Sequence, residues 1–569
     1  MSTRKTVFIL MLTLCLSATG QISLNNRPAV LDTLTGTMLV SVPEADFGLP
    51  YTARINFNDK IEQISINGTT LANGDNITFP VVDANARYQV TFYEPAPVTR
   101  TIQFTFLPIV DIQGTIAKTY NIITANVYNP DGKLITGPSK VKFRGSSINS
   151  NRIQKRGYHI KFVDNNGEKR EEKLLGLRND NSWILDGGTF DFIRIRNRVL
   201  TDLWLDMAAK PYYADREPSA RSGVRGAPVE VFRNNEYQGF YLLTEALDRK
   251  QMKLEKLDEN TNTIYGLLYK SSKRSPETRM MQTSPYDNNS ATWGGFEIKY
   301  PDLDDLCPTD YSVMFDAVHF VANSTDSAFI DSIKHVLDMP VIVDYYVFLE
   351  TTFAYDNEGK NMYWACYDQN RSRMITPAVW DLDATLGQYH APTYFHPNFL
   401  DENISLINFD NPQDNYLLRL IKLNPDRFRQ QARDRYRQLR DNLLSHQSIM
   451  ARFDHYLDLL SRSGATDREQ ARYNRHSDLN FRTLNLSQER DFIDQWLARR
   501  LEFLDNALFA QRENGDVNDD GSIDIGDLNA LINILLGRET DTPEADIDHN
   551  GKIDIADINA LITLITHRP

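Results

Sequence analysis

Short runs of alternating apolar and polar side chains fill residues 21 to about 112. Residues 51–57 and 88–92 show this period of two, which sets one face of a strand against a core and the other in solvent. The Asn-Gly pair at positions 67 and 68 ends another such run and is typical of a tight hairpin turn. The pattern predicts a small β-sandwich, and nothing in it suggests catalysis.

The next part of the chain mixes strand and helix periods. Strand-like runs lie at residues 140–143, 158–162, 229–232 and 239–243. Between them, residues 194–209 carry apolar side chains at the spacing of one helix face, namely Ile195, Val199, Leu203 and Met207. We therefore expect a mixed α and β region from about residue 117 onward.

The remaining pattern before the C-terminus predicts loops and helices. Residues 270–295 are rich in Ser, Pro, Asn and Thr, which predicts a long loop. Residues 341–353 are almost wholly apolar and fit either a buried helix or a buried strand. Residues 412–510 are strongly charged and helical in spacing, and the polar residues 511–514 predict a short hinge.

Two short acidic loops, each followed by an apolar helical stripe, end the chain. The stripes are Leu528, Leu531, Ile532 and Leu535, then Ile558, Leu561, Ile562 and Ile565. The residues expected to face a cation occupy loop positions 1, 3, 5, 7, 9 and 12, with Gly at position 6; oxygen side chains fall at positions 1, 3, 5, 9 and 12, whereas position 7 offers its backbone carbonyl. In the first loop the residues expected to face a cation are Asp516, Asn518, Asp520, Ser522, Asp524 and Asp527. In the second they are Asp546, Asp548, Asn550, Lys552, Asp554 and Asp557.

This spacing is that of a calcium loop. Calcium takes about six to eight hard oxygen ligands, position 7 contributes only its carbonyl, and the turn at position 6 needs a residue without Cβ. An acidic solvated tail is the alternative. Because the pattern occurs twice, in the same phase relative to the following helix, we expect two bound Ca²⁺ ions.

The two loops depart from an ordinary EF-hand pair, because position 12 is Asp and little helical sequence precedes the first loop. In both of these features, the segment from about residue 515 to residue 568 resembles a dockerin. The resemblance implies an α-helical module that fastens the chain to a cohesin-like domain on a scaffold or cell surface. It also implies partner contacts near positions 10 and 11, here Ile525, Gly526, Ile555 and Ala556.

The N-terminus has the form of a signal peptide. Arg4 and Lys5 precede an apolar run at residues 7–16, and small residues at 18–20 offer a cleavage site. The run is too short to span a membrane, and we find no longer one elsewhere. We expect cleavage after Gly20 and a secreted protein.

The net charge limits the classes of binding partner, and the cysteine content limits the number of disulfides. The formal net charge is −14, which argues against nucleic acid or anionic lipid as a default partner. Beyond the signal peptide, Cys307 and Cys366 are the cysteines of the sequence; they could pair, but two cysteines make no disulfide framework.

The chemistry of the chain is concentrated in its middle. Asp356 and Asn361 stand five positions apart, and Asp381 follows an apolar stretch. This is the spacing of a kinase catalytic loop and its metal-binding Asp, where one carboxylate orients the attacking hydroxyl and the other two groups hold magnesium. Upstream, Lys161 has the form of the strand lysine that contacts phosphates, and Arg144 opens a turn that could lie near them. Taken singly, each motif also fits an ordinary solvated loop, a strand end or an exposed lysine.

Several further motifs, in order, resemble the spore-coat CotH kinase family over about residues 120–505. They are Arg144-Gly-Ser-Ser147, Tyr158-x-Ile-Lys-Phe162, Leu174-Leu-Gly-Leu177, Asp180-x-Ser-Trp-Ile-Leu185, Arg196-Asn197, Tyr237 to Glu245, Gly294-Gly-Phe-Glu297 and Trp380-Asp-Leu-Asp383. The resemblance implies an atypical protein kinase that uses ATP and Mg²⁺ or Mn²⁺ to phosphorylate Ser or Thr of a protein acceptor. It implies roles by position: Asp356 as base, Asn361 and Asp381 on metal, Lys161 on phosphate and Glu245 near adenine.

The chain also departs from ordinary protein kinases. Lys161 and Asp356 are about twice as far apart in sequence, so large insertions are required, and no Gly-x-Gly-x-x-Gly is present. The helix at 194–209 has no Glu to pair with Lys161, so Asp202 or Asp206 would have to serve. Neither a His-Glu-x-x-His zinc motif nor a Gly-x-Ser-x-Gly elbow competes with the kinase interpretation.

We therefore predict an α+β protein in four parts: a signal peptide (1–20), a β-sandwich (21–115), a two-lobed CotH kinase-like domain (116–510) and a dockerin-like calcium module (511–569). The leading function is phosphorylation of an extracellular protein. Because ATP is scarce outside cells, the alternative is a non-catalytic binding or structural module in a cell-surface or cellulosome-like polysaccharide-degrading assembly. The sequence has no paired-carboxylate signature at glycosidase spacing.

Overall fold

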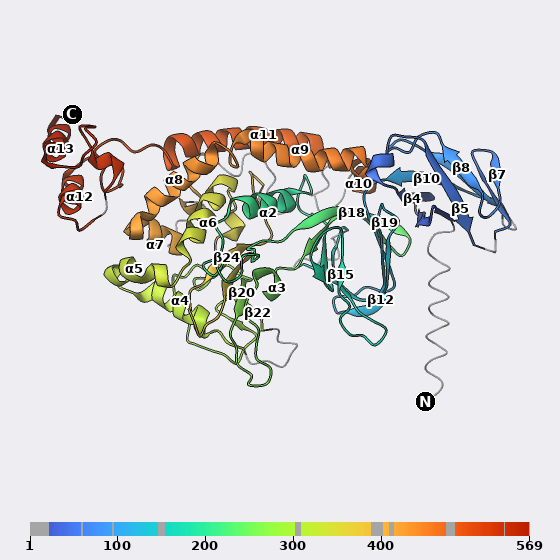
Figure 1. Ribbon diagram of the computed structural model, residues 1–569, viewed down its shortest axis with the longest axis horizontal. Helices are drawn as coiled ribbons and strands as arrows, with labels where there is room; N and C mark the ends of the chain where they lie inside the picture. The colour runs from blue at the N-terminus through green and yellow to red at the C-terminus, as the bar shows by residue number, and fades with distance from the viewer. Residues whose placement is uncertain are drawn as a thin grey trace.

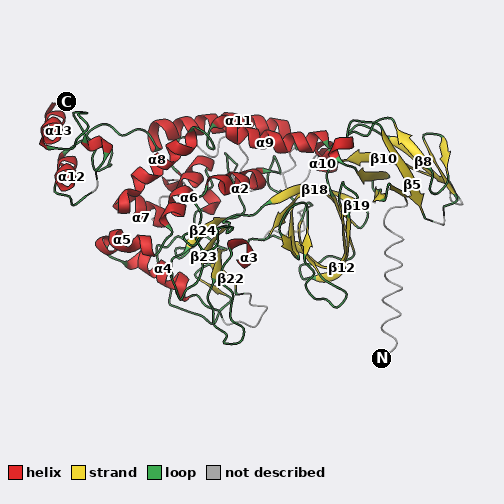
Figure 2. Cartoon of the chain, in the orientation of Figure 1, coloured by secondary structure: helices red, strands yellow, loops and turns green. Residues whose placement is uncertain are grey.

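The computed structural model describes residues 22–58, 61–93, 96–145, 154–301, 309–388, 402–408, 415–473, 484–539 and 541–567 (Figure 1). The expected signal peptide, residues 1–20, lies outside the described residues. Strands gather toward the N-terminal end of the molecule and helices toward the C-terminal end (Figure 2). No helix in the described part is both long enough and apolar enough to cross a membrane.

The N-terminal part is a β-sandwich, as the alternating pattern predicted. Its sheets have the strand orders β2-β1-β5-β8 and β3-β4-β10-β9-β6-β7, and apolar residues of both sheets form one core. The strands are β1 (Ile22–Leu24), β2 (Arg27–Pro28), β3 (Val30–Asp32), β4 (Thr37–Ser41), β5 (Tyr51–Phe57), β6 (Gln63–Ile66), β7 (Thr69–Leu71), β8 (Asn76–Phe79), β9 (Tyr88–Tyr93) and β10 (Val98–Thr105).

A closed barrel follows, with strand order β11-β12-β13-β14-β17-β19-β18. All four strand-like runs of the mixed region lie in it, and a parallel pairing of β11 with β18 closes it. Its strands are β11 (Ile109–Gln113), β12 (Asn121–Tyr128), β13 (Leu134–Arg144), β14 (Gly157–Phe162), β17 (Ser182–Asp186), β18 (Gly226–Arg233) and β19 (Glu236–Glu245). A short pair, β15 (Glu172–Lys173) and β16 (Asn179–Asp180), lies beside it.

The helical body packs around the largest core and a five-stranded sheet, β21-β22-β20-β23-β24. Residues 341–353 belong mostly to a buried helix, α6, rather than a strand. The helices are α2 (Arg196–Met207), α3 (Arg249–Met252), α4 (Ser312–Asn323), α5 (Asp326–Ser332), α6 (Met339–Thr352), α7 (Tyr416–Leu423), α8 (Phe428–Arg440), α9 (His446–Arg462), α10 (Ala465–Tyr473) and α11 (Leu486–Phe503). The strands are β20 (Leu267–Ser271), β21 (Thr292–Trp293), β22 (Phe296–Tyr300), β23 (Met362–Cys366) and β24 (Thr376–Val379).

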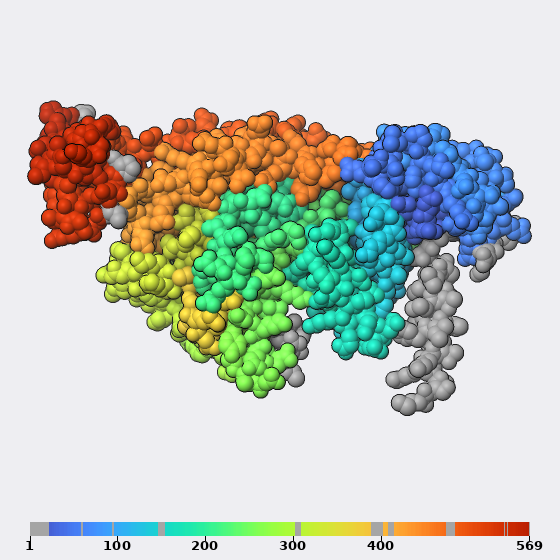
Figure 3. Space-filling view, viewed as in Figure 1, coloured from blue at the N-terminus to red at the C-terminus, as the bar shows by residue number. Residues whose placement is uncertain are grey.

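Two helices, α12 (Ile525–Leu535) and α13 (Ile555–His567), form the C-terminal module with a small core of their own. In the space-filling view this module is a separate lobe against the helical body (Figure 3). The contact is ionic as well as steric. Arg433 of α8 pairs with Asp519, and Arg429 donates to the carbonyl of Asn518 at 3.0 Å. The polar residues 511–514 therefore join two parts that also touch.

Cys366 is a buried free thiol whose Sγ lies 3.2 Å from the carbonyl oxygen of Ser372. Its candidate partner Cys307 lies outside the described residues. Burial raises the pKa of the Cys366 thiol to about 12, so the side chain is neutral at physiological pH.

Candidate active site and calcium loops

The predicted catalytic loop directly follows the buried helix α6, in a short 3-10 turn, η5 (Tyr355–Asn357). Asp356 is 6% exposed. Its carboxylate accepts hydrogen bonds from Lys360 Nζ at 2.8 and 3.0 Å and from Asn361 Nδ2 at 2.8 Å. Three hydrogen bonds from two donor groups therefore fix the orientation of this carboxylate, as a proton acceptor in a transfer reaction requires.

Asn357 joins the two segments that carry the predicted site. Its Nδ2 donates to the carbonyl of Asn361 at 2.9 Å and to that of Trp380 at 2.7 Å. The carbonyl of Asn357 in turn accepts a hydrogen bond from the Tyr345 hydroxyl at 2.7 Å. Because Asn357 is fully buried, this clamp sets the distance between the Asp356 loop and the strand end before Asp381. The sequence reasoning assigned it no role.

Both predicted metal ligands have left-handed backbone: φ is 50° at Asn361 and 61° at Asp381. Asn and Asp tolerate this region better than other residues with a Cβ, but it remains sparsely populated. Backbone of this kind gathers at functional sites, where the surrounding contacts hold it in place. The Asn357 clamp, bonded to the carbonyls of residues 361 and 380, is such a contact.

The Arg196-Asn197 motif at the start of α2 supports the same segment from the other side. Asn197 accepts from the backbone N–H of Leu382 at 3.1 Å and donates to Asp186 at 2.7 Å. Arg196 pairs with Asp191 at 2.6 Å, and its Nε donates to the carbonyl of Thr385 at 3.2 Å. The segment after Asp381 is thus held by side chains from a distant part of the chain.

These elements surround a cavity of about 240 Å³. The cavity brings together three of the predicted residues, Arg144, Asn361 and Asp381. Charged residues that the sequence did not single out as site residues also line it: Lys155, Arg156, Asp186, Lys270, Glu297, Lys360 and Asp383. Asp356 lies behind the lining and contacts Lys360 and Asn361, which both face the cavity.

The cavity concentrates carboxylates in a buried setting. Burial, and then the charges of Asp381, Asp191 and Asp186, raise the pKa of Asp383 well above its usual range. Burial lowers the pKa of Lys270, against the opposing attraction of Asp381. A divalent cation would relieve this repulsion, and carboxylate and amide oxygens are the hard donors that Mg²⁺ and Mn²⁺ prefer. The donor set therefore fits a divalent metal.

Two predicted residues lie elsewhere. Lys161 stands on β14 with its Nζ 5.2 Å from the ring centroid of Tyr120, and it does not line the cavity. Glu245 is fully buried and accepts backbone N–H groups of Arg178 and Arg225, each at 3.0 Å. Its described contacts are those of a structural anchor between two loops.

The expectation that Asp202 or Asp206 would pair with Lys161 is wrong. Asp202 pairs with Arg198 at 2.6 Å, and Asp206 pairs with Arg452 of α9 at 2.7 Å. Each carboxylate is drawn to an arginine on its own or a packed helix, because α2 lies against α9 rather than against β14.

A different lysine forms the buried ion pair of this site. Lys155 and Glu469 of α10 meet at 2.6 Å, both with fully buried side chains, and Arg194 adds a second contact to the same carboxylate at 3.1 Å. Lys155 lines the cavity. Burial, outweighing the attraction of Glu469, lowers the pKa of Lys155 to about 8. Sequence spacing could not find this pair, because its members are 314 positions apart.

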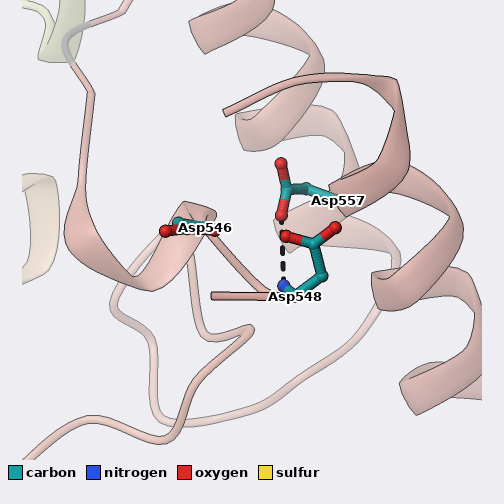
Figure 4. A group of neighbouring side chains, drawn as sticks. All are labelled: Asp546, Asp548 and Asp557. Carbon is teal, nitrogen blue, oxygen red and sulfur yellow. Dashed lines mark hydrogen bonds between the residues drawn. The ribbon is translucent and has the colours of Figure 1, made fainter. Parts of the chain in front are cut away.

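The two C-terminal loops adopt the same hydrogen-bonded form. Asp516 Oδ1 accepts the N–H of Asp520 at 3.1 Å, and Asp546 Oδ1 accepts that of Asn550 at 3.0 Å. In the second loop, carboxylate oxygens of Asp546, Asp548 and Asp557 lie within 4.8 Å of one another (Figure 4). The clustered oxygens are the hard donors that calcium takes.

The position-9 residues also cap helices. Asp524 accepts the backbone N–H of Gly526 at 2.6 Å, and Asp554 accepts that of Ala556 at 2.7 Å. One oxygen of each is therefore engaged at a helix N-terminus, which suits a position that often reaches calcium through water.

Comparison with family models gives two matches. The model described as CotH kinase protein matches residues 141–504, and the model described as Dockerin type I domain matches residues 514–566. These confirm both resemblances drawn from the sequence motifs. A search of curated proteins finds no match.

Proposed function

Because the chain belongs to the CotH kinase protein family and ends in a type I dockerin domain, we propose that it is an exported protein kinase anchored by its dockerin. It transfers the γ-phosphate of ATP to a Ser or Thr hydroxyl of an extracellular protein. The observation that carries the proposal is the cavity in which Asn361 and Asp381 meet, with Asp356 held directly behind them.

Four residues in or directly behind the cavity have defined parts in this transfer. The acceptor hydroxyl gives its proton to Asp356, its oxygen bonds to the γ-phosphorus, and the bond from that phosphorus to the bridging oxygen breaks to release ADP. Asn361 and Asp381 hold Mg²⁺ or Mn²⁺, which when bound neutralises charge on the phosphates. Asp383 supplies further carboxylate oxygen.

The phosphate-contacting cation is better assigned to Lys155, with Arg144, than to Lys161. Lys155 lines the cavity and has a buried glutamate partner, which is the arrangement expected of a lysine that holds phosphates at a fixed point. Lys161 is directed toward Tyr120 instead. The adenine-side role of Glu245 stays a prediction, since its observed contacts are to two backbone N–H groups and to the Arg225 guanidinium at 3.1 Å.

The dockerin binds a cohesin-like domain in the presence of calcium and so fixes the kinase outside the cell. Its position-10 residues support this, because Ile525 and Ile555 are 66% and 71% exposed. We place the domain limits at 21–115, 116–510 and 511–569. Truncation after residue 511 is expected to leave the catalytic part folded and to abolish attachment; loss of soluble protein would contradict that boundary.

A non-catalytic kinase-like module in a surface or polysaccharide-degrading assembly is the second candidate. One observation favours it: both carboxylate oxygens of Asp356 accept from Lys360, and one also accepts from Asn361. The ion pair between Asp356 and Lys360 must therefore break before Asp356 can accept a proton.

Calorimetry decides between the two. The mature chain is titrated with ATP and with ADP, in Mg²⁺, in Mn²⁺ and without metal, and transfer from labelled ATP to the chain itself and to Ser-rich peptides is followed. The kinase proposal expects metal-dependent binding and transfer. Asp316→Asn, an exposed aspartate paired with Arg373, serves as the control variant. If the chain binds no nucleotide with either metal or without metal, the kinase proposal is wrong and the non-catalytic module takes its place.

A further inference from the structure

The hairpin of β13 and β14 carries a row of basic side chains on its outer face. Inward-facing residues of the two strands fill the barrel core, so the alternate positions point outward. The basic face, as we define it, consists of Lys140, Lys142, Arg144 and Lys161. Strand register sets Lys140 directly opposite Lys161, and Lys142 opposite His159. Like charges placed directly across a pair of strands destabilise a sheet, which indicates a use for them beyond folding.

Tyr120 fixes the spacing of these cations. The Nζ atoms of Lys142 and Lys161 lie 4.4 and 5.2 Å from its ring centroid. Its hydroxyl hydrogen-bonds His159 Nδ1 at 2.9 Å, and His159 Nε2 hydrogen-bonds Ser182 Oγ at 2.8 Å. Two ammonium groups thus lie against one part-buried, hydrogen-bonded chain of polar side chains.

The surroundings keep the face positive. Burial, and then the charges of Lys161, Arg144 and Lys142, lower the pKa of His159 to about 3, so its imidazole is neutral. Within the described residues, Lys140, Arg144 and Lys161 form no ion pair with a carboxylate. By contrast, Arg178, beside the same barrel, pairs with Asp248 at 2.6 Å.

The basic face begins at the active cavity. Arg144 ends β13, stacks on Trp380 at 4.9 Å and lines the cavity, as does its cross-strand partner Gly157. From Gly157 to Lys161 the strand runs four residues further, or about 13 Å at roughly 3.3 Å per residue. On β13, alongside this path, cationic side chains occupy every second position at Lys140, Lys142 and Arg144, which is the period of side chains on one face of an extended peptide.

We propose that the basic face binds an acidic segment of the acceptor protein, so that the preferred acceptor is a Ser or Thr with Asp or Glu two to four residues away. The proposal rests on the proposed kinase function. An extended acidic peptide fits better than a nucleic acid, because Tyr120 is covered by ammonium groups instead of being open to base stacking. The protein's net charge of −14 also disfavours nucleic acid.

The test measures binding without nucleotide. Fluorescein-labelled peptides with one central Ser, carrying Glu at every second position or Gln in its place, are titrated with the mature chain by fluorescence anisotropy. The Glu peptide is expected to bind with a strong salt dependence and the Gln peptide weakly. In the double variant Lys142→Gln, Lys161→Gln, affinity for the Glu peptide falls about tenfold or more, while ADP binding in Mg²⁺ is unchanged.

Lys133→Gln is the matched control, since Lys133 is an exposed lysine in the turn just before β13, at the end of that strand opposite Arg144. Lys140→Gln alone, with a smaller expected loss, replaces the double variant if that does not fold. Unchanged Glu-peptide affinity in the variants overturns the proposal. So does a fall in ADP affinity, which would assign the face to nucleotide, or tighter binding of oligo-dT through the same lysines. Failure of phosphate transfer in the unaltered protein would refute the kinase function without altering this binding result.

Discussion

The candidate catalytic cavity and the two predicted calcium loops both gather carboxylates around a place for a cation, but they are built in opposite ways. Each calcium loop takes all its side-chain oxygens from twelve consecutive residues, and its module has a small core. The cavity takes Asp186, Asn361 and Asp381 from separate segments, and buried cross-links such as Asn357 and Arg196 hold them. The helical body around it has the largest core of the described chain.

This difference shows which interactions stabilise the arrangement of ligands at each site. In the calcium module the metal must offset repulsion among clustered carboxylates, so we expect metal binding and folding to be one event. In the cavity, packing and hydrogen bonds hold the ligands before any metal arrives.

Calcium removal has the largest effect, and it is confined to the C-terminal module. A fragment of residues 512–569 is expected to lose nearly all of its helical circular dichroism in excess chelator and to regain it when calcium is added, because its core is small. In the full chain, chelation leaves the main thermal transition in place. Equal helicity of the fragment with and without chelator would break the comparison.

Breaking the buried ion pair of the cavity comes next. Glu469→Gln leaves Lys155 buried without its carboxylate and is expected to cost about 3–5 kcal/mol in the free energy of unfolding. Glu259→Gln, at an exposed position, is the control. Urea denaturation of each variant gives the measurement. A loss below about 1 kcal/mol would mean that the pair is solvated in solution, and that the cavity is less preorganised than the calcium loops are.

The same contrast explains which parts were readable from sequence. The calcium loops and the alternating strands repeat at short, fixed spacings, so Asp546 and its neighbours could be identified directly. In the same way, the spacing of Asp356, Asn361 and Asp381 led to the prediction of a catalytic loop. Lys155 and Glu469 could not be found, because only the fold brings them together.

Two further misses have the same cause. Asp202 was expected to face β14, yet its arginine neighbour on α2 holds it. The closing of the barrel through β11 and β18 joins strands that are far apart in the chain and is invisible to any local pattern. Short-range periodicity therefore predicts elements and contiguous sites, whereas it does not predict which distant cations will complete a cavity.

Within the cavity, two aspartates are expected to separate binding from transfer. Asp381→Ala should remove metal–nucleotide binding, whereas Asp356→Ala should spare it and lower transfer a hundredfold or more, about 3 kcal/mol. Calorimetry measures the first and labelled-ATP transfer the second, with Asp316→Asn again as the control. If both variants still transfer phosphate, the site is wrong and Asp383 is the next residue to replace.

The smallest effect distinguishes the two calcium loops from each other. The first loop lies against α8, where Arg433 pairs with Asp519 and Arg512 approaches Asp519 at 3.0 Å and the position-1 ligand Asp516 at 3.9 Å. At the position of Asp519, the second loop has His549. The guanidinium groups repel an incoming calcium ion, so the first loop is expected to bind calcium more weakly than the second.

Arg433→Gln should therefore raise the calcium affinity of the first loop a few-fold, by less than about 1 kcal/mol, since Asp519 already offsets much of the charge of Arg433. The titration is run in an Asp546→Ala background, where the second loop cannot compete. The matched control is Arg437→Gln, one turn further along α8. Equal effects of the two substitutions would show that only long-range charge matters. A fall in affinity with Arg433→Gln alone would mean instead that the arginine holds the first loop in its calcium-ready form, as the buried cross-links do in the cavity.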